Sequence, residues 1–380
     1  MTRDYLFLVA SLFCWGIGEG MFFYFQPIYM QQLGASPVTI GFILGLGGLA
    51  MTFAHIPAGW MADRIGRRPL LWAAWLAGLV AAWLMALANG LLVFAMGAVL
   101  YNFTAFVISP LNSYLTTARG KLSVGRAITL SSSAFASGSV LGPFSAGLLG
   151  EALGLRAVYF AAAGLFVLST LLVFFLRSQP LEAHDGRQSF RDLLANPRYL
   201  NFLGLAFLVF FALYLPQPLT PNFLQNQRGL SLAQIGQLGS LGSLGNAVFN
   251  LALGHLAPRL GFFLAQAAVL FFGLLIWKGV GLPWYAAAYF MLGGYRAARA
   301  LASAQVRTFV GAHQMGLAYG IAETLNSLPL FLAPPLAGWL YDLRPDLVYP
   351  VSLTVIGLAL LLSLRYLPRP LPDPLPVSQD

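Results

Sequence analysis

Long apolar stretches follow one another along this chain and constrain its fold more than any other feature. Segments such as 38–62, 127–150 and 229–258 contain no Asp, Glu, Lys or Arg. A helix rises about 1.5 Å per residue, so roughly 20 such residues cross the hydrocarbon core of a bilayer. Only 9% of the residues are charged, against about 25% in soluble domains. The chain is therefore predicted to lie mainly in lipid, which excludes a soluble multidomain enzyme.

The apolar stretches predict twelve membrane-spanning helices. The run 69–118 is long enough for two of them, with a turn at Asn89-Gly90, and the run 5–31 is interrupted only by Glu19. The first run lacks a small-residue cleavage site, so we interpret it as a retained helix. The predicted spans are 5–31, 38–62, 70–88, 91–118, 127–150, 156–177, 199–225, 232–257, 262–280, 284–309, 316–340 and 347–367.

A polar segment at 178–198 divides these spans into six plus six. The predicted parts are an N-terminal six-helix bundle (1–177), a cytoplasmic linker (178–198), a C-terminal six-helix bundle (199–367) and a Pro-rich, disordered cytoplasmic tail (368–380).

The two halves also repeat each other. Gly34, Gly59 and Arg64 recur at one constant spacing, in the same order, as Gly229, Gly254 and Arg259. Related residues at equivalent ends of equivalent helices indicate two related bundles. The predicted fold class is an all-α integral membrane protein with twelve helices in two pseudo-symmetric six-helix bundles.

The basic residues predict the orientation. The net charge is +9, but the 21 Lys and Arg are spread over short loops, so we expect no nucleic-acid partner. Most of them fall on the side of the N-terminus, and the loops of the other side hold only Arg156, Arg228, Lys278 and Arg344. Basic loops stay in the cytoplasm. Both termini are therefore expected there, in a multi-pass protein of the plasma membrane, the inner membrane of a bacterial cell.

The loop between the second and third spans carries a recognisable motif. It reads Gly59-Trp60-Met61-Ala62-Asp63-Arg64-Ile65-Gly66-Arg67-Arg68. Glycine permits close helix approach or a tight turn, and an aspartate can face a helix N-terminus. The motif resembles the G-x-x-x-D-R-x-G-R-R signature of the major facilitator superfamily. That resemblance implies a gating latch made by Gly59, Asp63, Arg64, Gly66, Arg67 and Arg68, which joins the two halves in the outward-facing state. A plain basic loop would explain the arginines without the glycine spacing.

The fifth span contains a second motif, with Gly138, Gly142, Pro143 and Gly147. Its glycines allow close packing, and the proline removes a backbone donor, so we expect a hinge here. The motif resembles the G-x-x-x-G-P pattern that is pronounced in the drug-efflux branch of the superfamily. The fourth span lacks the arginine that many antiporters of the family carry, so coupling by that route is not expected.

Four charged residues lie well inside predicted spans, away from the span ends, where a charge costs about 2.5–3.5 kcal/mol. Glu19 has no partner in its own helix, and we interpret it as a proton or substrate site. The alternative is a neutral carboxyl bonded to a side chain such as Asn102 or Gln217. Arg296 and Arg299 are one turn apart and lie at a depth similar to that of Glu323. Either they form a structural salt bridge with Glu323, or one arginine meets an anionic group in the cavity.

The remaining site candidates are aromatic or polar residues near these charges: Phe23, Gln26, Asn102, Tyr214 and Gln217. Each could line an apolar cavity or hold helices together. A single Cys14 and four scattered histidines offer no metal-ligand spacing, and no phosphate-binding glycine loop is present. We therefore expect no metal and no cofactor.

The combined prediction is a secondary transporter, not an enzyme, that moves a small amphipathic molecule by alternating access, as proton-coupled efflux by an antiporter. Its expected partners are the small-molecule substrate, membrane lipid and protons, and it is expected to be a monomer. The alternatives are a transporter of an organic anion bound by Arg296 or Arg299 and, in another class, a lipid flippase with a lateral opening.

Overall fold

The computed structural model describes residues 1–179, 193, 195–306, 308–310 and 315–366. The side chains of 55–60, 62–64, 109, 315–317 and 366 are outside this description. Within these limits the chain is helical and contains no strand. The predicted tail at 368–380 and most of the predicted linker lie outside the described residues.

The first half of the chain forms six spans, four of them close to their predicted bounds. The helices are α1 (Arg3–Phe23), α2 (Gln26–Gln32), α3 (Pro37–Ile65), α4 (Arg67–Leu87), α5 (Leu91–Phe103), η1 (Thr104–Val107), α6 (Ile108–Ala118), α7 (Val124–Leu153) and α8 (Leu155–Phe174). The second half repeats this order with α10 (Pro197–Tyr214), α11 (Thr220–Arg228), α12 (Leu232–Gly254), α13 (Pro258–Lys278), α14 (Leu282–Leu292), α15 (Gly294–Val306), α16 (Met315–Leu343) and α17 (Val348–Tyr366).

Four predicted spans are broken, which corrects their expected continuity. The first ends at Phe23 and resumes at Gln26, and Pro27 lies in the first turn of α2, where its missing N–H costs nothing. The seventh breaks between α10 and α11, a stretch that holds Pro216 and Pro218. The fourth passes through η1, and the tenth breaks at Gly293.

Seven helices are individually long and apolar enough to cross a membrane: α1, the first part of α3, α4, α8, α10, α13 and α17. The bent pair α5 and α6, at 46°, makes an eighth candidate. The other spans are broken or contain polar and small residues, such as the serines of α7. Such helices are too short or too polar to cross a membrane when each is judged by itself. In a bundle they can still cross it, because neighbouring helices cover their polar residues.

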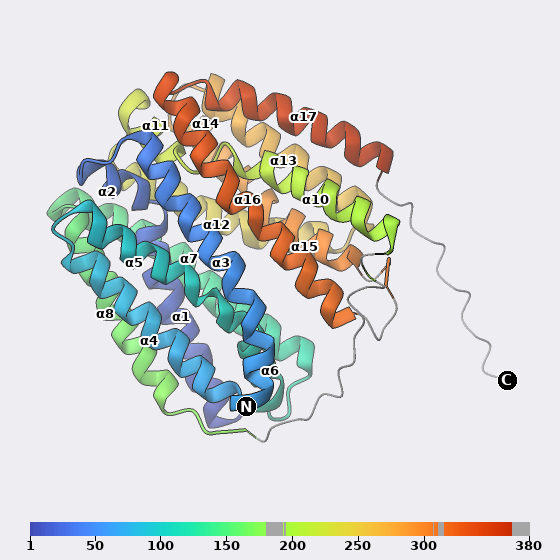
Figure 1. Ribbon diagram of the computed structural model, residues 1–380. Helices are drawn as coiled ribbons and strands as arrows, with labels where there is room; N and C mark the ends of the chain where they lie inside the picture. Colours follow the sequence, from blue (N-terminus) through green and yellow to red (C-terminus); the bar gives the residue numbers. More distant parts are fainter. Residues whose placement is uncertain (180–192, 194, 307, 311–314, 367–380) are drawn as a thin grey trace.

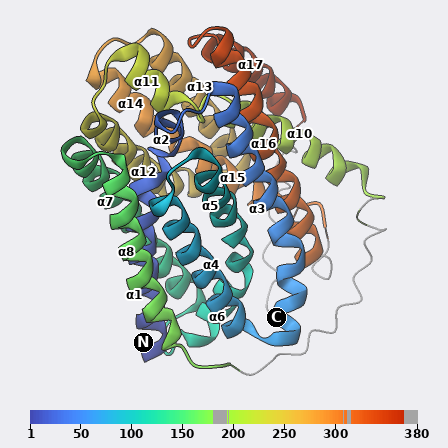
Figure 2. The ribbon, with the colours of Figure 1, turned by 60° about the vertical axis from the view of Figure 1, so that its left-hand side comes forward.

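The two halves meet along two helix pairs. In both ribbon views α3 lies beside α16, and α7 packs against α12 in the same interface (Figures 1 and 2). A Cβ added at Gly41, Gly45 or Gly48 of α3 would collide with the α16 backbone. Likewise, a Cβ at Gly236 of α12 would collide with the carbonyl oxygen of Pro143 in α7. The interface is therefore closed down to backbone contact.

These contacts lie at one end of the molecule. We call the end with Arg3 and Gly66 the N-terminal face, and the end with α2 and α11 the opposite face (Figure 2). The contacts of α3 come from its first half, near the opposite face, and those of α7 from its second half, near the same face. Toward the N-terminal face, Gly125 and Gly254 have open space around them, and Leu251 is 70% exposed. The described glycine contacts between the halves thus lie near the opposite face.

Candidate functional site

Glu19 lies at the end of a short hydrogen-bond chain between α1 and α5. The Tyr101 hydroxyl donates to a carboxylate oxygen of Glu19 at 2.5 Å, and the indole N–H of Trp15 donates to the Tyr101 oxygen at 3.0 Å. Trp15 and Glu19 are one turn apart on α1, so both face the same helix. Glu19 is half-buried.

Arg296 belongs to the other half of the molecule, on the less buried side of α15 that also carries Arg299. It is exposed, and among the described residues it makes no hydrogen bond or salt bridge. Tyr289, seven residues earlier and so on the same side of this span, meets the Tyr24 ring of the first half at 6.1 Å between centroids. Arg296 therefore lies on the side of the second half that faces the first half.

Arg299 and Glu323 form a salt bridge. An Nη of Arg299 lies 3.0 Å from one carboxylate oxygen of Glu323, and the Ser303 hydroxyl donates to the other at 2.8 Å. The side chains are 20% and 40% exposed. The ion pair expected from sequence is therefore present for Arg299, and it leaves Arg296 outside the pair.

The other candidates lie around these charges but differ in their contacts. Asn102 donates to the Ala98 carbonyl at 2.9 Å, and Gln217 donates to the Leu213 carbonyl at 2.7 Å. Neither is the partner of Glu19 that the sequence suggested, because each side-chain amide donates to the backbone carbonyl four residues earlier. That partner is Tyr101, the neighbour of Asn102.

The aromatic candidates and Gln26 sit near the break of the first span and in α10. Phe23 follows Glu19 by one turn, is 46% exposed and meets the Tyr24 ring edge to face, at 5.4 Å between centroids. Gln26 is buried at the start of α2. The Tyr214 ring lies 5.6 Å from that of Tyr295, beside Arg299.

The motif after α3 is only partly described. Gly66 adopts a φ of 86°, which only glycine takes without strain, and starts α4. Arg67 donates to Thr117 at 2.9 Å and to Gln179 at 3.2 Å, and Arg68 stacks over Trp72 at 4.0 Å. All of these residues except Thr117 border a pocket of 240 Å³ at the N-terminal face. Gly59, Asp63 and Arg64 lie in α3, but their side chains are outside the described residues.

The glycines of α7 serve two contacts. A Cβ at Gly138 or Gly142 would collide with the α1 backbone, whereas Gly147 lies against the start of α12. Pro143 stands between these sets, and α7 continues through it as one helix. The motif therefore packs α7 against both halves at once, and the hinge role stays a prediction.

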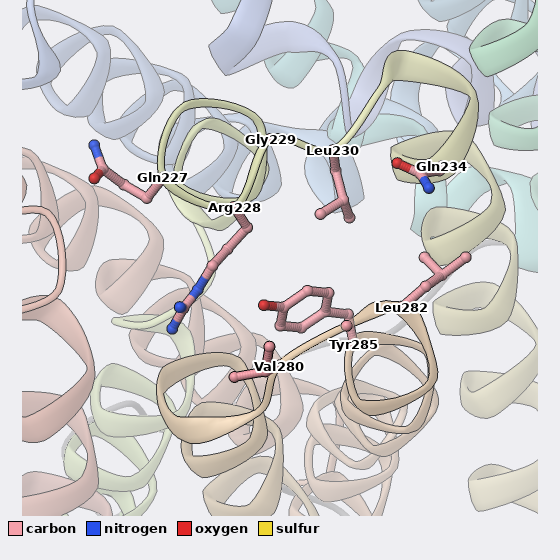
Figure 3. Close-up of a pocket in the computed structure, with 9 residues that line it drawn as sticks. Gln227, Arg228, Gly229, Leu230, Gln234, Val280, Leu282 and Tyr285 are labelled. Carbon is pink, nitrogen blue, oxygen red and sulfur yellow. The ribbon is translucent and has the colours of Figure 1, made fainter.

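A larger pocket of 480 Å³ lies at the opposite face of the second half. Figure 3 shows Leu230, Leu282 and Tyr285 pointing into it, with Arg228 along one side. The Arg228 guanidinium donates to the Trp277 carbonyl at 2.7 Å, and the Tyr285 hydroxyl donates to the Gly279 carbonyl at 3.2 Å. Both hydrogen bonds go to backbone carbonyls at the end of α13 and the start of the following loop. The lining contains none of Glu19, Arg296, Arg299 and Glu323, so this pocket is separate from the central charges.

Sequence reasoning missed Tyr101 and Trp15. Both are aromatic residues in segments rich in aromatic residues, where most rings only pack. Their placement in the sequence was the available signal. Trp15 precedes Glu19 by one helical turn, and Tyr101 lies in the fourth span, which was expected to face Glu19. Only coordinates show that the two polar atoms and the carboxyl meet.

Comparisons with known proteins agree with this architecture. The chain is 28% identical over 195 residues to the multidrug resistance protein MdtG of Salmonella arizonae, a match that covers 49% of this chain and 48% of that protein. It is 25% identical over 173 residues to the MFS-type transporter MJ1560 of Methanocaldococcus jannaschii, which covers 45% of each chain. The match therefore spans about half the length of these curated relatives.

Solved structures share the fold over almost the whole chain. A mutant form of the nucleoside transporter NupG superposes with a TM-score of 0.85 at 15% identity, and the match covers 96% of this chain and 100% of that one. A bacterial homologue of the human lysosomal transporter Spinster, in an inward-facing and occupied conformation, gives 0.74 at 15% identity, with 95% and 96% covered.

The family assignment rests on sequence as well as fold. Residues 8–328 match the family model described as the Major Facilitator Superfamily. That range includes nearly all of the first half, the second half as far as the middle of α16, the motif after α3 and the four intramembrane charges. The described helices form the expected two bundles, and the predicted fold class is confirmed. The chain belongs to the Major Facilitator Superfamily and is a multi-pass membrane protein.

Proposed function

We propose that this transporter moves small amphipathic molecules by alternating access, with Glu19 as the proton carrier, and that it works as an exporter. The observation that carries the proposal is the position of Glu19. Glu19 lies deep in the first span, its carboxyl accepts a hydrogen bond from Tyr101, and the residue is half-buried. An intramembrane carboxyl in such a place is suited to exchange a proton as access alternates.

The interface between the halves supports alternating access. The contacts between the halves lie near the opposite face and involve glycines. Helices that meet at glycines can slide or separate with little loss of side-chain packing. We assign the N-terminal face to the cytoplasm, because most Lys and Arg of the chain lie on that side. In this assignment the structure is the inward-open state, in the plasma membrane.

Amphipathic substrates and export are supported by two further observations. The region around Glu19 is rich in rings, such as Phe23, Tyr24 and Tyr101, and offers few polar groups. The relatives that match half of this chain carry the name multidrug resistance protein. We expect the protein to work as a monomer, with its latch formed when the N-terminal face closes.

The test compares wild type with Glu19→Gln in proteoliposomes under an imposed pH gradient. The probes are 1-naphthoate, 1-naphthylmethylamine and 1-naphthylmethanol, which share one apolar body and differ in charge. We expect the variant to equilibrate a transported probe and to lose its gradient-driven accumulation. Asp346→Asn, which removes a surface carboxyl paired with Arg344, is the matched control. Undiminished accumulation by Glu19→Gln would exclude Glu19 as the proton carrier.

A further inference from the structure

We infer that Arg296 is the anchor for an anionic group of the substrate, so that the transported molecules are organic anions with an aromatic or apolar body. This inference rests on the proposed transport function and names its substrate class. It depends on three observations: which arginine is already paired, where the other one points, and what surrounds it.

Arg299 is occupied and Arg296 is not. The Glu323 carboxylate already accepts from Arg299 at 3.0 Å and from Ser303 at 2.8 Å, one contact on each oxygen. The acid thus has both oxygens engaged and neutralises one of the two arginines. Arg296, one turn earlier on the same helix, makes no hydrogen bond or salt bridge with the described residues.

Arg296 lies on the exposed side of α15, which packs on α10, α12, α13 and α16 of its own half. Tyr289 is seven residues earlier, hence on the same side of this span, and its ring meets that of Tyr24 in the first half. Arg296 therefore lies on the side of the second half that faces the first half, where Glu19 bonds to Tyr101 and not to Arg296. A cation without a partner is costly inside the membrane, and binding of an anion lowers that cost. An arginine at this position is therefore suited to bind an anionic substrate.

The surroundings favour a ring-bearing or apolar body. The ring centroids of Tyr24 and Tyr289 lie 6.1 Å apart across the two halves, and those of Tyr214 and Tyr295 lie 5.6 Å apart beside the arginines. Guanidinium groups bind carboxylates, sulfonates and phosphates through two parallel hydrogen bonds. Aromatic walls add apolar contact but do not discriminate sharply among bodies. The site therefore selects for charge more than for shape.

The experiment measures binding by purified full-length protein in phosphatidylcholine nanodiscs, followed by intrinsic tryptophan fluorescence. The anionic probes are 1-naphthoate, 1-naphthalenesulfonate and 1-naphthyl phosphate, and the comparison probes are 1-naphthylmethylamine and 1-naphthylmethanol. The variants are Arg296→Gln, Arg296→Lys, which keeps the charge, and Arg344→Gln, a surface arginine paired with Asp346 that serves as control. Thermal unfolding checks that each variant is folded.

We expect at least one anion to bind wild type more tightly than the amine and the alcohol. Loss of one charge-assisted contact in Arg296→Gln should weaken that binding by about tenfold. Arg296→Lys should weaken it less, and Arg344→Gln should leave it unchanged. Failure of all three anions to bind wild type, equal binding by Arg296→Gln, or equal binding of the amine would each overturn the inference.

Two further arms separate other outcomes. Repeating the titration in nanodiscs that contain phosphatidylglycerol tests whether a lipid headgroup takes the place; unchanged affinity supports a soluble anion, and loss of binding overturns it. Glu19→Gln should still bind the anion, because it keeps Arg296. Gradient-driven accumulation by Glu19→Gln therefore contradicts the proton role, whereas undiminished anion binding by Arg296→Gln contradicts the substrate class.

Discussion

The hydroxyl of Tyr101 lies 2.5 Å from a carboxylate oxygen of Glu19 and donates to it, while Trp15 holds that hydroxyl from the other side at 3.0 Å. Two side chains of α1 and one of α5 are thus joined by two hydrogen bonds inside an apolar bundle. This arrangement fixes the orientation of the Glu19 carboxyl relative to α5.

Replacing Tyr101 with Phe should weaken gradient-driven transport. The variant loses the hydroxyl that donates to Glu19 and accepts from Trp15, so the carboxyl is no longer held in one orientation. Loss of this hydrogen bond should lower gradient-driven accumulation severalfold, up to about tenfold. Accumulation is measured in proteoliposomes. Tyr285→Phe, which removes a hydroxyl at the opposite face, should not lower it.

Breaking the salt bridge of Arg299 should destabilise the second half. Glu323→Gln leaves the arginine uncompensated, and the expected loss is about 1–2 kcal/mol, discounted because both side chains are partly exposed. Thermal unfolding of the detergent-solubilised protein measures the loss. The surface pair of Arg344 and Asp346 gives the control, since Asp346→Asn should change the midpoint little. Equal shifts of the unfolding midpoint in the two variants would mean that the pair of Arg299 and Glu323 stabilises the fold no more than the surface pair does.

A larger residue at Gly142 should prevent α1 and α7 from packing. An added Cβ would meet the carbonyl oxygen of Ile17 and lie 2.8 Å from the Gly20 Cα. Gly142→Ala is expected to cost about 1–3 kcal/mol, because backbone must move to relieve the overlap. Unfolding midpoint and yield of folded protein report it. Gly164→Ala, on α8 with open space around it, is the matched control and should be neutral or slightly stabilising.

Valine at Gly236 should push the halves apart at the opposite face. The side chain would occupy the space taken by the Pro143 carbonyl and by Gly147. With Cys14→Ser, Gln31→Cys and Asn222→Cys added, cross-linking by a short bis-methanethiosulfonate, which joins two thiols, reports closure, because Asn222 donates to Gln31 at 2.6 Å. Gly236→Val should lower the yield severalfold, whereas Gly254→Val, with open space nearby, should not. Unchanged yield in Gly236→Val would show that this contact does not control closure.

The sequence predicted the spans better than it predicted their interruptions. Apolar length sets how many times a chain crosses lipid, and that signal is strong from residue 5 to residue 367. The break after Phe23 depends on how the halves meet, and prolines such as Pro27 and Pro216 only permit it. Proline in a membrane helix is compatible with either a kink or a break, as the unbroken α7 shows at Pro143.

The site was predictable in its charges and not in its pairings. Any acid or arginine inside a span is a candidate on energetic grounds, so Glu19, Arg296, Arg299 and Glu323 stand out in the sequence. Which arginine meets Glu323 depends on the rotation of α15 against α16. A one-turn spacing puts both arginines on one face, and only the structure shows that Arg299 forms the pair.

Alternating access requires the seal at the opposite face to open in every transport cycle. The most direct test locks that seal with the cross-link between Gln31→Cys and Asn222→Cys, in the Cys14→Ser background, and measures uptake of the fastest-transported naphthalene probe. Transport is predicted to stop when the link forms and to return when a reductant cleaves it. Full transport by quantitatively cross-linked protein would contradict alternating access in this chain.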